Sequence, residues 1–181
     1  MTTKKKLMTA EELLRLEEEH EDKEYELLDG ELVEFPMPGM EHEALVVNVV
    51  YALEHHVRPR RLGRVVGAVG IWLRRGPDRV RMPDVCFFSA GRIPGEQGYT
   101  GVVPDFIVEI ISADRTAEYV QQKMEEWVAA GVRLAWAVYP ETRSVVVYRG
   151  LDDIKGYQQG EVLDGAPVLP EFTLPVAELF A

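Results

Sequence analysis

The first forty residues of this 181-residue chain change from a helical to an extended pattern of apolar positions. The sequence Thr9-Ala10-Glu11-Glu12 is a capping box, because its threonine can accept the first free amides and a glutamate follows three residues later. It predicts a short helix that ends near His20. The runs 25–28 and 31–35 flank Asp29-Gly30, a pair that favours a two-residue turn. This arrangement predicts a β-hairpin.

The next sixty residues predict a second helix and a pair of strands. Apolar residues recur at helical spacing over roughly 41–57. Two apolar-rich runs, 64–74 and 79–89, are joined by Gly76-Pro77-Asp78 and predict antiparallel strands around a tight turn. The glycine-rich segment 90–103 is long enough to predict a loop with mobility or function.

The segment 106–111 is almost continuously apolar and β-branched, as expected of a central strand covered on both faces. A helix over 116–130 that ends at Gly131 follows, and then strands over 134–139 and 144–148. The last thirty residues show a mixed pattern. The order of helices and strands predicts one domain over residues 1–181, of α/β (α+β) class.

Composition adds a cellular setting to this fold. The chain is 46% apolar and 28% charged, as in ordinary globular proteins. Cys86 is the only cysteine, so no disulfide can form within the chain. Residues 1–7 are lysine-rich and are followed by charged residues instead of the apolar run of a signal peptide. No stretch of about 18 apolar residues exists. We therefore expect a cytoplasmic protein, neither exported nor embedded in a membrane.

The formal charge of −11 argues against a nucleic-acid partner, but the charges are unevenly distributed. Residues 58–81 hold eight arginines and a single acidic residue, Asp78. This split predicts either one basic region on an acidic body or solvated arginines on exposed strand faces.

Two carboxylates stand out in apolar surroundings. Glu109 lies in the middle of the predicted central strand, and burying an ionised carboxylate without a partner costs several kcal/mol. A metal ion, a buried lysine or arginine, or protonation would compensate it. Asp84 immediately precedes the apolar run 85–88. If the two lie on adjacent strands, they are about 4.5–5.5 Å apart and can bind one hard cation such as Mg²⁺.

Two further residues bear on this pair. Asp105 also follows a proline, but it is four residues from Glu109 on one strand, about 13 Å away, and is interpreted as a strand-start residue. Lys123 falls within the apolar stripe of the helix 116–130. It either extends its stem along the stripe to reach solvent or directs its ammonium at the acidic pair.

The order Pro83-Asp84, Glu109 on an apolar strand, Ser112, and Lys123 four residues before Trp127 resembles the family described as "Putative restriction endonuclease", within the PD-(D/E)XK nuclease superfamily. The segment 25–33 and His42 also match the opening hairpin and next helix of that family.

The resemblance implies a restriction-endonuclease-like mixed sheet flanked by helices, with Asp84 and Glu109 as metal ligands and Lys123 near the attacking water. The superfamily's usual lysine position holds Ile111, so Lys123 would supply that charge from the neighbouring helix. His42 and Glu31 are lesser candidates, as a water-orienting base and an additional acid; a histidine at a helix start is more often a cap or surface residue.

These residues predict a Mg²⁺-dependent or Mn²⁺-dependent endonuclease that hydrolyses DNA and works as a homodimer, because cutting two strands needs two active sites. The alternative is a catalytically inactive module of the same fold that binds nucleic acid or a protein partner. Ile111 and the acidic body favour that alternative.

Overall fold

The computed structural model describes residues 7–20, 23–95 and 98–181, so the lysines at 4–6 and the expectation about a signal peptide lie outside it. Its helices and strands, in chain order, are α1 (Ala10–Glu19), β1 (Lys23–Leu28), β2 (Glu31–Pro36), α2 (Met40–Arg60), β3 (Gly63–Gly67), β4 (Ile71–Arg74), β5 (Arg79–Arg81), β6 (Val85–Ser89), the short 3-10 helix η1 (Ala90–Arg92), β7 (Phe106–Ile110), α3 (Ala117–Ala130), β8 (Leu134–Tyr139), β9 (Ser144–Tyr148), β10 (Ile154–Tyr157), β11 (Val162–Asp164), β12 (Thr173–Pro175) and α4 (Val176–Leu179).

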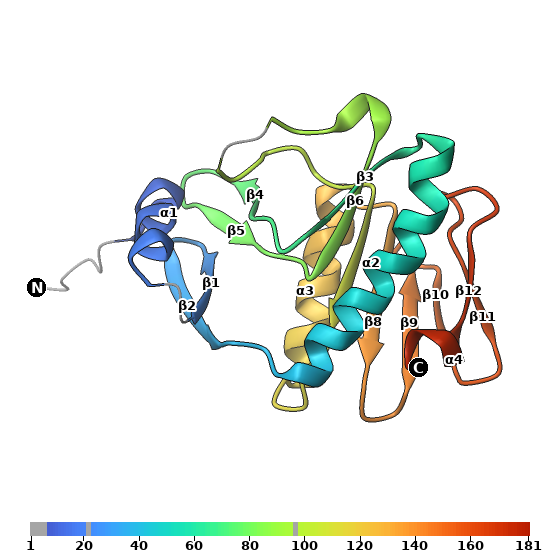
Figure 1. Cartoon of the computed structure of the whole chain (residues 1–181). Coiled ribbons are helices and arrows are strands. Elements are labelled where there is room, and N and C mark those ends of the chain that lie inside the picture. Colours follow the sequence, from blue (N-terminus) through green and yellow to red (C-terminus); the bar gives the residue numbers. More distant parts are fainter. Residues whose placement is uncertain (1–6, 21–22, 96–97) are drawn as a thin grey trace, which may run out of the picture.

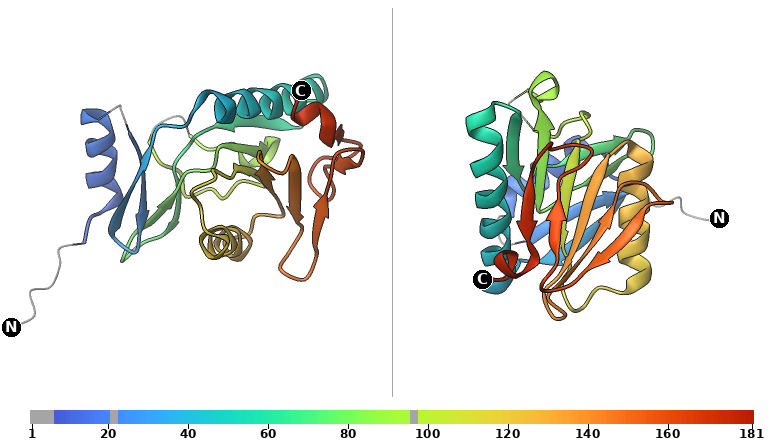
Figure 2. Two further views of the ribbon diagram at one scale, coloured as in Figure 1. Left: turned by 90° about the horizontal axis from the view of Figure 1, so that it is seen from below. Right: turned by 90° about the vertical axis from the view of Figure 1, so that its right-hand side faces the viewer.

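The main sheet has six strands in the order β10-β9-β8-β7-β6-β3. Only β7 and β8 run parallel; the other neighbours are antiparallel, so the sheet is mixed. Helix α2 covers one face and α3 the other, as Figures 1 and 2 show. The fold class is therefore the one predicted, with β7 inside the sheet.

Alternation along β7 determines where its carboxylate points. Phe106, Val108 and Ile110 pack into the core beneath α2, whereas Ile107 packs with α3. Because side chains of a strand alternate between the two faces, Glu109 lies on the same face as Ile107 and points toward α3.

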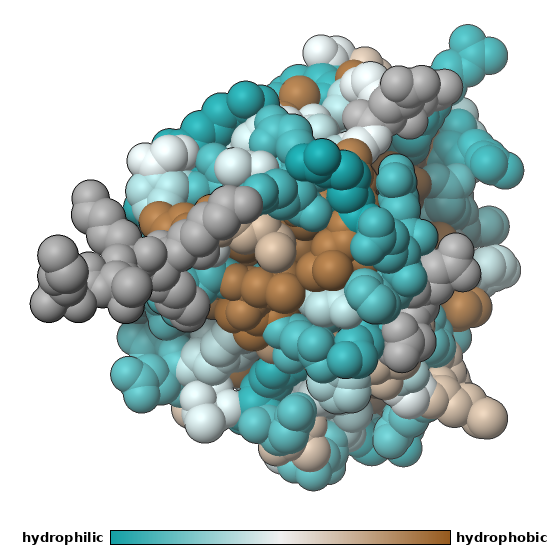
Figure 3. Space-filling view, turned by 90° about the vertical axis from the view of Figure 1, so that its left-hand side faces the viewer, coloured by the Kyte–Doolittle hydropathy of each residue, from teal (hydrophilic) through white to brown (hydrophobic). Residues whose placement is uncertain are grey.

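A second sheet, in the order β2-β1-β5-β4, stands beside the main one and carries α1. Thr9 and Glu12 form the predicted capping box, and Leu13 of α1 packs on Leu27 and Val80 of this sheet. Seen from the side of α1, apolar residues gather in the middle of a mainly polar surface (Figure 3).

The runs 64–74 and 79–89 pair antiparallel around a tight turn as predicted, but each run is divided into two short strands. The chain passes from one sheet to the other within each run, so four short strands replace two. Ala68 takes a positive φ of 37° between β3 and β4, and Pro83, which has no amide donor, separates β5 from β6. The tight turn at 75–78 does join β4 to β5.

The described parts of the segment 90–103, residues 90–95 and 98–103, are mainly loop, as predicted. They contain η1, and Thr100 forms a parallel bridge with Ile71 of β4. Cys86 is buried, which raises the pKa of its thiol to about 12. None of the helices in the described part of the chain is long and apolar enough to cross a membrane.

Candidate active site

A cavity of about 290 Å³ lies where β1, the end of β7, α3 and the start of α2 meet. It collects acidic side chains from four separate segments of the chain. The acidic residues that line it are Glu24, Glu26, Asp84, Glu109 and Asp114, and the basic ones are His42, Arg115 and Lys123. Acidic residues thus outnumber permanently charged bases in its wall, which favours a cationic ligand.

Asp84 immediately precedes β6 and Glu109 lies on the neighbouring strand β7, on one face of the sheet. Val85 pairs with Val108 in the antiparallel ladder, and extending this register by one position places Asp84 opposite Glu109. A carboxylate oxygen of Asp84 also accepts a hydrogen bond from the backbone amide of Ile110. The two predicted candidates therefore line one cavity from adjacent strands.

Glu109 is almost fully buried, and α3 supplies a donor to each of its oxygens. Lys123 Nζ lies 2.8 Å from Oε2, and Trp127 Nε1 donates to Oε1 over 2.7 Å. Lys123 and Trp127 are four residues apart, so they lie on one face of the helix. Of the two predicted orientations of Lys123, the one directed at the acids is observed.

Lys123 also contacts a second buried acid that sequence reasoning missed. Its Nζ lies 3.0 Å from Glu26 Oε1, and the same carboxylate accepts from Arg81 Nη1 at 2.5 Å. Tyr119 donates its hydroxyl to Glu26 over 3.2 Å. Glu26, Arg81, Lys123 and Glu109 thus form a continuous buried network between the two sheets.

The network separates the pKa values of its two carboxyl groups. Burial would raise the pKa of Glu26, but Lys123 and Arg81 outweigh it and lower that pKa. For Glu109, burial outweighs Lys123, and with repulsion from Asp84 and Glu26 it raises the pKa to about 7. The carboxylates in turn raise the pKa of Lys123 despite its burial. One permanently charged ammonium therefore serves two acids.

His42 contacts Asp84 from the first turn of α2. Its Nε2 lies 3.3 Å from Asp84 Oδ1, and its Nδ1 is 3.4 Å from Glu43 without hydrogen-bond geometry. Burial would lower the pKa of His42, but Asp84 and Glu43 outweigh it and raise that pKa. His42 is thus placed to hold Asp84 through a contact that strengthens when the imidazole is protonated.

Arg115 lines the mouth of the cavity between two aromatic rings. Its guanidinium lies 4.1 Å from the ring centroid of Phe35 and 5.3 Å from that of Tyr119. Its ion-pair contact with the adjacent Asp114 is long, at 3.9 Å. Stacking against the two rings thus holds the planar, permanently charged guanidinium of Arg115 in the wall of the cavity.

Two other predicted residues lie away from the cavity. Glu31 is exposed at the turn end of the hairpin, two ladder positions beyond the pair Glu26–Val33, and does not line the cavity. Asp105 precedes β7 and is buried, where it accepts from the Ser89 amide and from Arg133. The structure therefore supports the interpretation of Asp105 as a strand-start residue.

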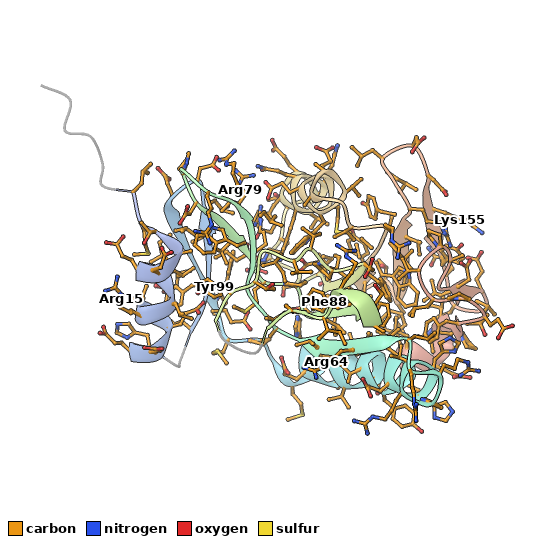
Figure 4. The ribbon with its side chains drawn as sticks, turned by 90° about the horizontal axis from the view of Figure 1, so that it is seen from above. Arg15, Arg64, Arg79, Phe88, Tyr99 and Lys155 are labelled. Carbon is orange, nitrogen blue, oxygen red and sulfur yellow. The ribbon has the colours of Figure 1, made fainter. Side chains whose placement is uncertain are left out.

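The arginines of 58–81 do not form one basic surface. Arg81 is buried against Glu26, and Arg79 pairs with Asp29 and Glu126. Figure 4 shows Arg64 beside α2 and Arg79 on the second sheet, in separate parts of the molecule. The prediction of a single basic region is wrong, because this segment crosses between both sheets.

A family model described as "Putative restriction endonuclease" matches residues 10–177, nearly the whole chain. The chain belongs to the "Putative restriction endonuclease" family. Asp84, Glu109 and Lys123, whose order in the sequence suggested this family, all line the cavity.

A crystal structure of "a putative nuclease belonging to DUF820" from Anabaena variabilis ATCC 29413 has the same fold, with a TM-score of 0.82 at 24% sequence identity. The match covers 96% of this chain and 97% of the other. Comparison with curated proteins gives no match. The family supports a nuclease, and the solved structure supports the fold.

In this member of the "Putative restriction endonuclease" family, carboxylates in the cavity wall are the residues that could hold a divalent cation. Mg²⁺ is usually held by one or two carboxylates, with water and phosphate oxygens completing its shell. Asp84 and Glu109 are such a pair of hard oxygen donors. Within the described residues, no three His, Cys, Asp or Glu side chains are grouped as a complete metal cage.

Proposed function

We propose that this protein is a divalent-metal-dependent DNA endonuclease of PD-(D/E)XK type that hydrolyses phosphodiester bonds as a homodimer. The observation that carries the proposal is that Asp84 just before β6, Glu109 of β7 and Lys123 of α3 line one acidic cavity. Membership of the "Putative restriction endonuclease" family supports the same reaction class.

Asp84 and Glu109 would hold Mg²⁺ or Mn²⁺. When bound, such an ion lowers the pKa of a coordinated water and offsets the negative charge of the phosphate. Burial raises the pKa of Glu109, and a bound cation would offset that effect by favouring the ionised form that a ligand requires. The Ile110 amide and His42 fix the orientation of Asp84.

Lys123 would stabilise the charge that develops on the scissile phosphate. Its ammonium stays protonated, because the carboxylates around it raise its pKa. Ile111, at the superfamily's usual lysine position, lies two residues after Glu109 and also lines the cavity. Lys123 approaches Glu109 from α3, so it supplies a cation beside the metal ligands without a lysine on the strand.

Arg115 would bind a phosphate of the DNA backbone at the mouth of the cavity. Phe35 and Tyr119 orient its guanidinium, and a planar guanidinium can donate two hydrogen bonds to one phosphate. We expect Arg115→Gln to weaken DNA binding and to reduce the salt dependence of binding by about one ionic contact.

The test is cleavage of plasmid DNA with Mg²⁺ or Mn²⁺, with and without EDTA. We expect Asp84→Asn and Glu109→Gln to abolish cleavage and metal affinity together. At metal concentrations that saturate the site, Lys123→Met is expected to lower cleavage roughly 100-fold or more, since removal of one electrostatic donor costs that much in other enzymes.

Glu31→Gln is the matched control, because it removes the charge of an exposed carboxylate that does not line the cavity. It is expected to cleave like the wild type. If the wild type binds duplex, single-stranded and branched DNA but cuts none of them, and Asp84→Asn binds equally, then the carboxylates are structural and the inactive binding module is the correct interpretation.

A further inference from the structure

Helix α2 carries apolar residues on its outer side as well as on the side that packs on the sheet. The inner side contributes Leu45, Val49, Leu53 and Val57 to the core. On the outer side, Met40, Val47 and Tyr51 are 90%, 63% and 73% exposed, and Ala44 is exposed as well.

The outer residues form one stripe. Met40, Ala44, Val47 and Tyr51 follow the spacing i, i+4, i+7 and i+11, so they lie along one side of the helix. Figure 4 shows side chains of α2 projecting away from the body of the molecule. A helix that is solvated on one side normally carries polar residues there, so this stripe is suited to a protein contact.

Charge along α2 is distributed in the way that a second copy of the chain would match. The first turn contains Glu41 and Glu43, and the last turn contains Arg58 and Arg60. Arg58 also pairs with Glu54 of its own helix at 3.1 Å but stays 85% exposed. If two α2 helices cross antiparallel about a twofold axis, the acidic turn of each meets the basic turn of the other. A parallel arrangement would place like charges together.

We propose that the outer side of α2 is the homodimer interface, formed with α2 of a second copy in antiparallel orientation. A twofold axis near residue 49 places Val47 of one copy opposite Tyr51 of the other. Burial of these residues supplies the affinity, because exposed ion pairs contribute about 1 kcal/mol at most. The charged turns set the orientation.

The dimer would also extend the candidate active site, a consequence that rests on the proposed nuclease function. His42, in the first turn of α2, lines the cavity, and Met37 just before the helix lines it as well. Antiparallel pairing brings Arg58 and Arg60 of the second copy toward this end of the helix. They would add positive charge beside an acidic cavity and favour the approach of DNA. The two copies of Met40 would lie about 27 Å apart along the helix axis.

The experiment is sedimentation equilibrium of the full chain over a dilution series. We expect the wild type to be a dimer and Val47→Glu/Tyr51→Glu to raise its dissociation constant roughly 100-fold or more, because both substitutions place charges at the centre of the interface. Leu151→Glu/Ile154→Glu is the matched control, with the same charges on side chains that are 52% and 50% exposed elsewhere. It is expected to stay dimeric. Circular dichroism verifies that each variant is folded.

Cysteine pairs test the orientation. The native Cys86 is buried and does not interfere. On mild oxidation, Met40→Cys/Arg58→Cys is expected to give a covalent dimer, and Met40→Cys alone is not. A covalent dimer from Met40→Cys alone would indicate parallel helices and overturn the proposal.

A monomeric wild type, or a dimer that Val47→Glu/Tyr51→Glu leaves intact, overturns the proposal. If the wild type is monomeric and that variant loses DNA binding, the stripe contacts DNA instead. A dimer that dissociates as expected but never cleaves DNA would contradict the proposed function and leave the interface standing.

Discussion

Replacing Lys123 with methionine tests the buried network directly. Methionine fills much of the space of the lysine stem but removes the ammonium that lies 2.8 Å from Glu109 and 3.0 Å from Glu26. Glu26 keeps Arg81 as a partner, whereas Glu109 keeps only the indole donor of Trp127. The uncompensated charge of the variant is therefore concentrated on Glu109.

The cost should depend on pH. The pKa of Glu109, about 7 in the folded protein, lies above the unfolded value of about 4.3, so its contribution to stability is lost as pH rises through the folded pKa. Loss of Lys123 moves that pKa higher still. At pH 6, Glu109 is mostly protonated in both proteins, and we expect the variant to lose about 1–3 kcal/mol. Between pH 7 and pH 9 the difference should grow by about 1.4 kcal/mol per pH unit.

Urea denaturation in EDTA, followed by tryptophan fluorescence at pH 6, 7, 8 and 9, measures this difference. Lys155→Met is the control, because Lys155 is exposed on β10 beside the Tyr157 ring. It should change the free energy of unfolding by no more than about 1 kcal/mol at every pH. A pH-independent cost for Lys123→Met would refute the assignment of the buried charge to Glu109.

Two further predictions concern the hydrogen bonds of buried carboxylates. Trp127→Phe keeps an aromatic ring in the core but removes the donor to Glu109, and urea denaturation should show a loss of about 1–3 kcal/mol; no loss would mean that this hydrogen bond is dispensable. Burial would raise the pKa of Asp105, but the Ser89 amide and Arg92 outweigh it and lower that pKa. Its stabilising effect is therefore present above the unfolded pKa of about 3.9 and lost as pH falls through the folded value, so the stability cost of Asp105→Asn should shrink in acid denaturation below about pH 4 and would be constant if Asp105 were unpaired.

Most elements that position the site could be predicted because local rules specify them. The capping box at Thr9, the Asp29-Gly30 turn and the helix end at Gly131 each depend on a few neighbouring residues. Glu109 and Lys123 were found because a charged residue within an apolar strand or stripe requires compensation. Such signals need no knowledge of tertiary contacts.

The remaining parts of the site depend on contacts between distant segments. Glu26 is a charged residue on a hairpin strand, and local sequence gives no reason to expect it to be buried. It is covered because this face of the second sheet contacts Lys123 of α3. Arg81 was counted with a basic surface for the same reason, although its partners Glu26 and Glu126 are 55 and 45 residues away in the chain. No local pattern indicates which of two charged faces will be covered.

A crystal soaked in Mn²⁺ tests most directly whether Asp84 and Glu109 hold one divalent cation. We expect an anomalous scattering peak in the cavity, about 2.0–2.6 Å from an oxygen of each carboxylate, and no such peak in Asp84→Asn. A peak bound elsewhere, or an equal peak in the variant, would contradict it.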